Sequence, residues 1–119
     1  MIENGQRTQV IDGLTFKLMG DCFPEQYDVY DENNQEVAYV RLRHSELYVA
    51  HPVTNEYWWN TSNWDTAFPK DRRLKGYGCF DDDEERTYFL NLIAKIIHKK
   101  LQNPSWEVWQ ENGLLKLID

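Results

Sequence analysis

Residues 81–101 read DDDEERTYFLNLIAKIIHKKL, and this stretch decides the fold. Its apolar side chains recur at helical spacing and form one broad stripe, made of Phe89, Leu92, Ile93, Ile96, Ile97 and Leu101. Acidic residues at the start and basic residues at the end match the helix dipole. Asp81 or Asp82 is the expected N-cap, with Glu85 as the capping-box partner of Asp82. Because Pro104 stops the pattern, we predict a helix from about Asp82 to Leu101.

Alternating apolar and polar residues upstream of this helix predict strands. One strand has the strongest pattern, because its residues Ala38, Val40 and Leu42 alternate with polar or aromatic ones. The expected strands are residues 8–12, 14–19, 26–30, 36–43, 47–50 and 56–59. Strands followed by a helix indicate an α+β fold: an antiparallel sheet of about five or six strands, with one long amphipathic helix packed on one face. Asn112-Gly113 lies between apolar runs and adds a candidate C-terminal hairpin.

Length and composition indicate one domain over residues 1–119, with a formal net charge of −7. We expect residues 1–6 to be frayed and residues 53–80 to form a long loop region rich in aromatic and basic side chains. No apolar stretch is long enough to cross a bilayer, and the first residues lack the pattern of a secretion signal. These features favour a cytoplasmic protein, and the acidity argues against nucleic acid as a partner.

The two cysteines, Cys22 and Cys79, are expected to be thiols in a reducing cytosol. A disulfide between them stays open as an alternative, because both lie near predicted turns.

The sequence has few features that point to catalysis. The acidic run 81–85 lacks the spaced ligands and the glycine of a calcium loop, so we interpret it as a helix cap and predict no metal and no cofactor. Nucleophile motifs are absent. One alternative is a small enzyme with a site around His44, His51 and Glu46, because the two histidines flank one predicted strand.

A cluster of aromatic and basic residues is the main candidate for binding. Tryptophan, tyrosine and arginine are enriched at protein-binding hot spots. The predicted binding residues are Tyr57, Trp58, Trp59, Trp64, Phe68, Arg72 and Arg73. The competing interpretation is that these aromatics cover a core edge beneath the long loop.

The stretches 24–31 (PEQYDVYD) and 37–43 (VAYVRLR) resemble small uncharacterised bacterial and phage-borne proteins that share this hairpin core. The likeness covers about residues 14–101. It implies a prokaryotic or phage origin, and therefore the cytoplasm of a bacterial host cell. The resemblance carries no known activity, so no catalytic residues follow from it.

These observations favour a small acidic, non-enzymatic module that binds another protein. An inhibitor of a bacterial defence or nuclease protein, acting by occluding a partner surface, fits the size and acidity. Besides the small enzyme with a histidine site, the alternatives are an immunity protein and a structural protein that forms a homodimer or larger homo-oligomer through its surplus aromatics.

Overall fold

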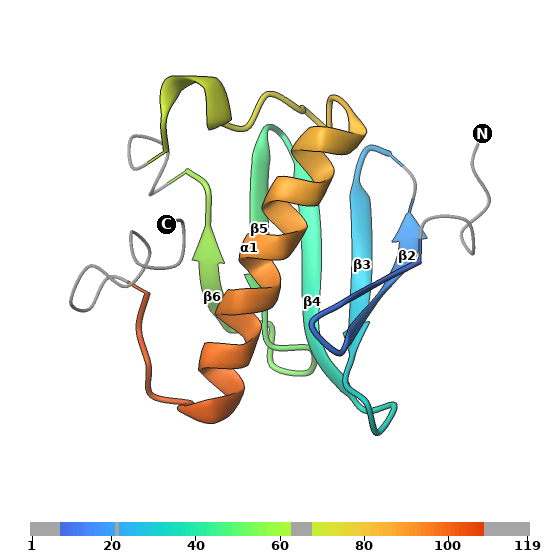
Figure 1. Cartoon of the computed structure of the whole chain (residues 1–119), viewed down its shortest axis with the longest axis vertical. Helices are drawn as coiled ribbons and strands as arrows, with labels where there is room; N and C mark the ends of the chain where they lie inside the picture. The colour runs from blue at the N-terminus through green and yellow to red at the C-terminus, as the bar shows by residue number, and fades with distance from the viewer. Residues whose placement is uncertain (1–7, 21, 63–67, 109–119) are drawn as a thin grey trace.

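The computed structural model describes residues 8–20, 22–62 and 68–108. It has an antiparallel six-stranded sheet and one long helix, which confirms the predicted α+β fold (Figure 1). Neighbours in the sheet are also neighbours in the sequence, so the sheet is a meander in the order β1 to β6. The elements are β1 Gln9–Ile11, β2 Leu14–Gly20, β3 Glu25–Tyr30, β4 Glu36–Arg43, β5 Glu46–Ala50, β6 Tyr57–Asn60, the 3₁₀ turn η3 Lys70–Arg72 and α1 Asp83–Gln102.

Two sequence predictions fall outside these residues. The frayed segment 1–6 is one, and most of the candidate C-terminal hairpin is the other. The predicted loop region 53–80 contains β6 and η3, and irregular segments lie between them and α1.

The core lies between one face of the sheet and α1. Alternation in the strands sends their apolar side chains toward the helix, as the sequence predicts. The largest fully buried side chains on the strands are Leu14, Phe16, Leu18, Tyr27, Leu42 and Leu47, and on the helix Phe89, Leu90, Ile93, Ile96 and Ile97. Leu101 corrects the predicted stripe, because its side chain is 45% exposed.

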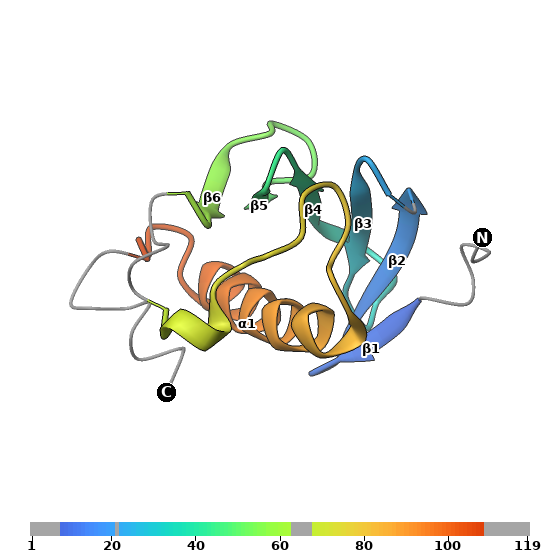
Figure 2. The ribbon, with the colours of Figure 1, turned by 90° about the horizontal axis from the view of Figure 1, so that it is seen from above.

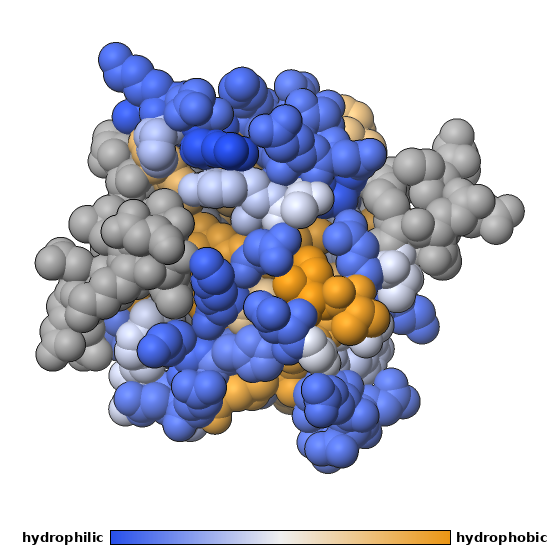
Figure 3. Space-filling model, viewed as in Figure 1, coloured by the Kyte–Doolittle hydropathy of each residue, from blue (hydrophilic) through white to orange (hydrophobic). Residues whose placement is uncertain are grey.

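The sheet curves around the helix. Register shifts interrupt the β2–β3, β3–β4 and β5–β6 pairings, and such bulges bend a sheet. As a result β1 lies beside α1 on the helix side (Figure 2). His98 holds this contact, with its Nε2 2.7 Å from the carbonyl oxygen of Asp12. Figure 3 shows a strongly apolar area at this place on an otherwise largely hydrophilic face.

A buried ion pair joins the sheet to the start of the helix. Glu25 is on the inward face of β3 and is 1% exposed, and Arg86 on the first turn of α1 is 7% exposed. The guanidinium Nε donates to Glu25 Oε2 over 2.8 Å and a second nitrogen donates to Oε1 over 3.2 Å. The Tyr27 hydroxyl and the Phe80 amide also donate to this carboxylate. Both carboxylate oxygens are therefore compensated for their removal from water.

Arg86 is held in its charged form. Burial alone would lower the pKa of its guanidinium, but the hydrogen bond and the charge of Glu25 outweigh burial and raise the pKa above its ordinary value.

We expect Arg86→Ala to lower the free energy of unfolding by about 3–5 kcal/mol, because it leaves a buried carboxylate without its cation. The matched control is Arg72→Ala, which removes an exposed arginine 3.4 Å from Glu84 and should cost less than about 1 kcal/mol. Urea denaturation of the two variants measures both losses. An equal loss of unfolding free energy in the two variants would contradict the central role of the Glu25–Arg86 pair.

Candidate functional site

The structure separates the predicted binding residues. Tyr57 is 56% exposed and Arg72 is exposed, while Trp58 and Arg73 are half-buried. Trp59 and Phe68 are each 3% exposed. Trp64 lies outside the described residues.

Trp59 and Phe68 belong to the core, which corrects their predicted place on a binding surface. Trp59 pairs with Val49 in the sheet and so faces the helix. Phe68 packs on it with ring centroids 6.2 Å apart, and lies 5.4 Å from the ring of Phe89. The alternative interpretation, aromatics that cover a core edge beneath the loop, therefore describes these two residues.

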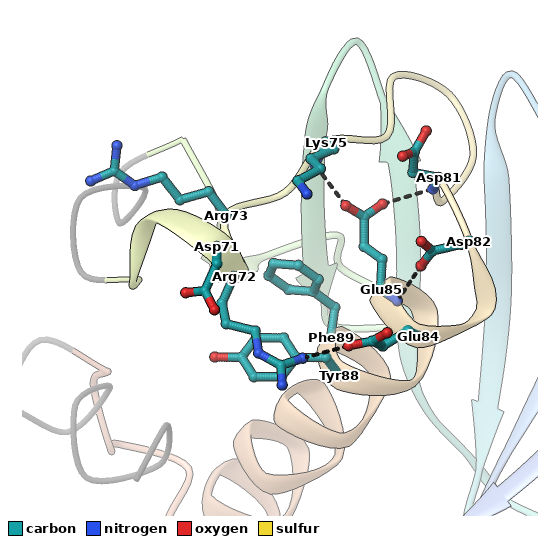
Figure 4. Close-up of a pocket in the computed structure, with 10 residues that line it drawn as sticks. All are labelled: Asp71, Arg72, Arg73, Lys75, Asp81, Asp82, Glu84, Glu85, Tyr88 and Phe89. Carbon is teal, nitrogen blue, oxygen red and sulfur yellow. Dashed lines mark hydrogen bonds and ion pairs between the residues drawn. The ribbon is translucent and has the colours of Figure 1, made fainter.

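The two basic residues lie near the start of α1, where each contacts a neighbouring group of the same chain. Arg72 stacks over the ring of Tyr88, with its Cζ 5.1 Å from the centroid, and contacts Glu84. Arg73 donates from Nε to the carbonyl oxygen of Phe68 over 3.4 Å. Figure 4 shows Arg73 pointing away from the acidic residues that line this small pocket of about 110 Å³.

The carboxylates of this pocket fix the backbone. Asp82 caps the helix by accepting from the Glu85 amide over 2.8 Å, as predicted. Glu85 does not form the predicted capping box. Its carboxylate instead accepts from the amides of Lys75 (2.7 Å), Gly76 (3.2 Å) and Asp81 (2.8 Å), all three of which precede the helix. Figure 4 shows the bonds to Lys75 and Asp81. The carboxylates of this pocket therefore attach the loop before α1 to the first turn of the helix. Among the described residues there is no group of three side chains that could hold a metal ion.

The two histidines of the alternative enzyme site lie at opposite ends of β5. His44 precedes the strand and His51 follows it, so the extended backbone separates them by roughly 20 Å. His44 contacts Tyr77, and His51 contacts Trp58. Glu46 accepts a hydrogen bond from the Ser62 hydroxyl over 2.6 Å. A catalytic site shared by both histidines is therefore wrong.

Three loops meet at the end of the sheet where His44 lies, and they present an exposed aromatic group that we name the end patch: Phe23, His44 and Tyr77. Phe23 is 72% exposed and Tyr77 is 56% exposed. The Tyr77 ring lies 6.3 Å from that of Phe23 and 5.8 Å from that of His44. The His44 Nδ1 is also 3.2 Å from the Tyr77 hydroxyl.

Backbone hydrogen bonds fix the loops of the end patch. The amides of Phe23 and Glu25 both donate to the carbonyl oxygen of Gly78, over 2.9 and 2.7 Å. The Ser45 amide donates to the carbonyl oxygen of Tyr77 over 2.7 Å. Gly78 is required beneath the ring, since a Cβ there would lie 2.3 Å from Phe23 Cδ1.

The end patch also includes unfavourable backbone. Phe23 has φ +53°, in the left-handed region that bulky residues rarely adopt. His44 also has a positive φ, but it forms with Ser45 the two-residue turn between β4 and β5, in which such angles are usual. Each such residue costs on the order of 1–3 kcal/mol and persists only where its surroundings hold it. Such residues concentrate at functional sites.

Sequence reasoning missed Phe23 and Tyr77. The only local signals were an aromatic before Pro24 and an aromatic between Gly76 and Gly78. Neither signal predicts a shared surface, because nothing local shows that the two segments meet.

The sheet face that α1 does not cover has a row of tyrosines, one on each of the strands β3 to β6: Tyr30, Tyr39, Tyr48 and Tyr57. The Tyr39 hydroxyl donates to Gln26 over 2.6 Å, and the Tyr48 and Tyr57 centroids are 4.8 Å apart. Tyr48 is 8% exposed with Arg41 stacked on its ring, and burial raises the pKa of its hydroxyl although Arg41 partly offsets this. Tyr30 and Tyr39 are half-buried and Tyr48 is buried, so Tyr57 is the one ring of this row that is as exposed as Tyr77.

Comparison with known proteins leaves the site as the only guide to function. No family model, curated protein or solved structure matches the chain. Cys22 and Cys79 are not joined by a disulfide. Within the described ranges, no helix has the length and apolar character needed to span a membrane.

We expect Phe68→Ala to lower the free energy of unfolding by about 3–5 kcal/mol, because it opens a cavity beside Trp59 and Phe89. Tyr57→Ala is the control, since it removes an exposed ring and should cost clearly less. Chemical denaturation followed by tryptophan fluorescence compares them. A Phe68→Ala protein as stable as the wild type would place Phe68 outside the core.

We expect Glu85→Ala to free the loop before α1. Three amides lose a charged acceptor, so those of Lys75, Gly76 and Asp81 should exchange hydrogen faster, with a stability loss of about 1–3 kcal/mol. Glu84→Ala is the neighbouring control, because Glu84 is 80% exposed. Hydrogen exchange followed by NMR reads each amide. Equal exchange in the two variants would show that Glu85 does not hold the loop.

Proposed function

We propose that this chain is a small non-enzymatic module that binds another protein through the end patch. The observation that carries the proposal is that two large aromatic rings, Phe23 and Tyr77, are exposed on a backbone that hydrogen bonds hold in place. Exposed aromatics on rigid supports are the typical anchors of protein interfaces, because binding orders little that was free before.

The end patch lowers the stability of the isolated chain, and this supports the same proposal. Phe23 has an unfavourable backbone conformation, yet its ring remains mostly in water. Neither feature stabilises the isolated chain. A partner with an apolar pocket would remove both rings from water, and the Tyr77 hydroxyl and His44 would supply polar contacts at the edge.

The net charge of −7 suggests the character of the partner. Acidic proteins associate fastest with basic surfaces, such as those of proteins that handle nucleic acid. We therefore retain the inhibitor of a bacterial defence or nuclease protein as the specific form of the proposal. Occlusion of the partner surface is the expected mode of action, because it requires no chemistry from this chain.

A second copy of the chain is the alternative partner. Two end patches facing one another across a two-fold axis would bury the same rings. This alternative requires a dimer in solution, which distinguishes it from a different protein.

The test is affinity capture from a lysate of the source cell, with the wild type compared with Phe23→Ala/Tyr77→Ala. We expect one stoichiometric partner that the double variant loses, and at least about 30-fold weaker binding for each single variant. Gly78→Ala should weaken binding as well, because its new methyl group displaces the Phe23 ring.

Val53→Ala is the matched control, since Val53 is an 81% exposed apolar residue beyond the other end of β5. It should retain the partner. Capture that is equal for the wild type and the double variant would overturn the proposal. So would a wild type that captures nothing and elutes as a monomer, whereas a dimer that Phe23→Ala dissociates would identify a second copy as the partner.

A further inference from the structure

The face of the sheet that α1 leaves uncovered carries an arginine whose hydrogen-bond donors are unused (Figure 2). Arg41 is on this face of β4, because its neighbours Val40 and Leu42 are fully buried on the other face. Its Nε is buried without a hydrogen-bond partner, and Arg41 donates to no described residue. The fold therefore gives this guanidinium a fixed place but no acceptor.

The fixed place comes from Tyr48. The Cζ of Arg41 lies 4.6 Å from the centroid of the Tyr48 ring. A ring attracts the flat face of a guanidinium, whereas the N–H groups point outward in the plane of the guanidinium. Stacking therefore orients Arg41 without using its donors. Only Nε is buried, so the two terminal nitrogens reach the surface, where an acceptor from outside can approach them.

The residues that face Arg41 across the sheet carry no charge. They are Gln26 on β3 and Tyr48 on β5. The side-chain oxygen of Gln26 accepts from the Tyr39 hydroxyl over 2.6 Å. The nearest acceptor across the strand is therefore engaged by a different donor.

The other cations on this face of β2 to β5 do face carboxylates. Lys17 is opposite Asp28, and Arg43 is opposite Glu46. Opposite charges that face one another across strands compensate each other. On these four strands, Arg41 is thus the cation of the uncovered face that lacks a facing carboxylate.

Tyr57 adds an exposed ring beside this cation. It is 56% exposed, and its ring centroid lies 4.8 Å from that of Tyr48. Arg41 and Tyr57 come from β4 and β6, the two strands that flank β5, so they lie on either side of Tyr48. Arginine and tyrosine are among the residues enriched at the energetic centres of protein interfaces.

We propose that the uncovered sheet face docks an acidic segment of a partner protein, with one carboxylate on Arg41 and an apolar side chain on Tyr57. The charge complementarity is local, because Asp28 and Glu46 lie on the strands next to Arg41 and the whole chain has a net charge of −7. These charges repel a polyanion such as nucleic acid more strongly than a single carboxylate. This surface shares no residue with the end patch, so it stands or fails independently of the proposed function.

The probes are the peptides acetyl-Phe-Glu-amide and acetyl-Phe-Gln-amide, which have the same shape and differ in the charge of one side chain. We expect the wild type to bind the Glu peptide at least about fivefold more tightly, as measured by NMR titration. The Glu peptide should also shift the Arg41 Nε–H signal, and the Gln peptide should leave that signal in place.

Arg41→Gln removes the guanidinium and should bind the two peptides equally. Arg43→Gln is the matched control, because it removes an exposed arginine from the same face of β4 and should retain the preference of the wild type. Phe23→Ala/Tyr77→Ala should retain it as well, which separates this surface from the end patch.

Equal binding of the two peptides by the wild type, or no binding of either, would overturn the proposal. The same holds if Arg43→Gln loses the preference as fully as Arg41→Gln does. Tighter binding of a short oligothymidine than of the Glu peptide, lost in Arg41→Gln, would instead assign the face to nucleic acid. A wild-type dimer that Arg41→Gln dissociates would make a second copy the occupant, and the proposal would again be wrong.

Discussion

The buried pair of Glu25 and Arg86 is the constraint on which the rest of the structure depends. A carboxylate on the inward face of a central strand is tolerated only when a cation and further donors meet it. Arg86 can do so only if the first turn of α1 lies over the end of β3. The pair therefore fixes where the helix starts above the sheet, and the apolar stripe then determines how the remaining turns pack.

Glu25 also links the core to the surface. The side chain of Glu25 is in the buried pair, while its amide donates to Gly78 beside the amide of Phe23. The Phe80 amide, which donates to the Glu25 carboxylate, fixes the segment that contains Tyr77 from its other side. The exposed rings of the end patch thus rest on backbone that the core holds, which explains how the unfavourable φ angle persists at Phe23.

Periodicity made the fold predictable from the sequence, because period-two strands and a capped amphipathic helix are local signals. The predicted strands agree with the structure to within a residue or two. The candidate site was not predictable in the same way. Trp58 and Trp59 are adjacent residues of the same type, yet alternation along β6 buries Trp59 and leaves Trp58 half-buried beside His51. Phe23 and Tyr77 meet only through the folded chain. Glu25 has the pattern of a polar residue near a turn, and only Arg86, far along the sequence, explains its burial.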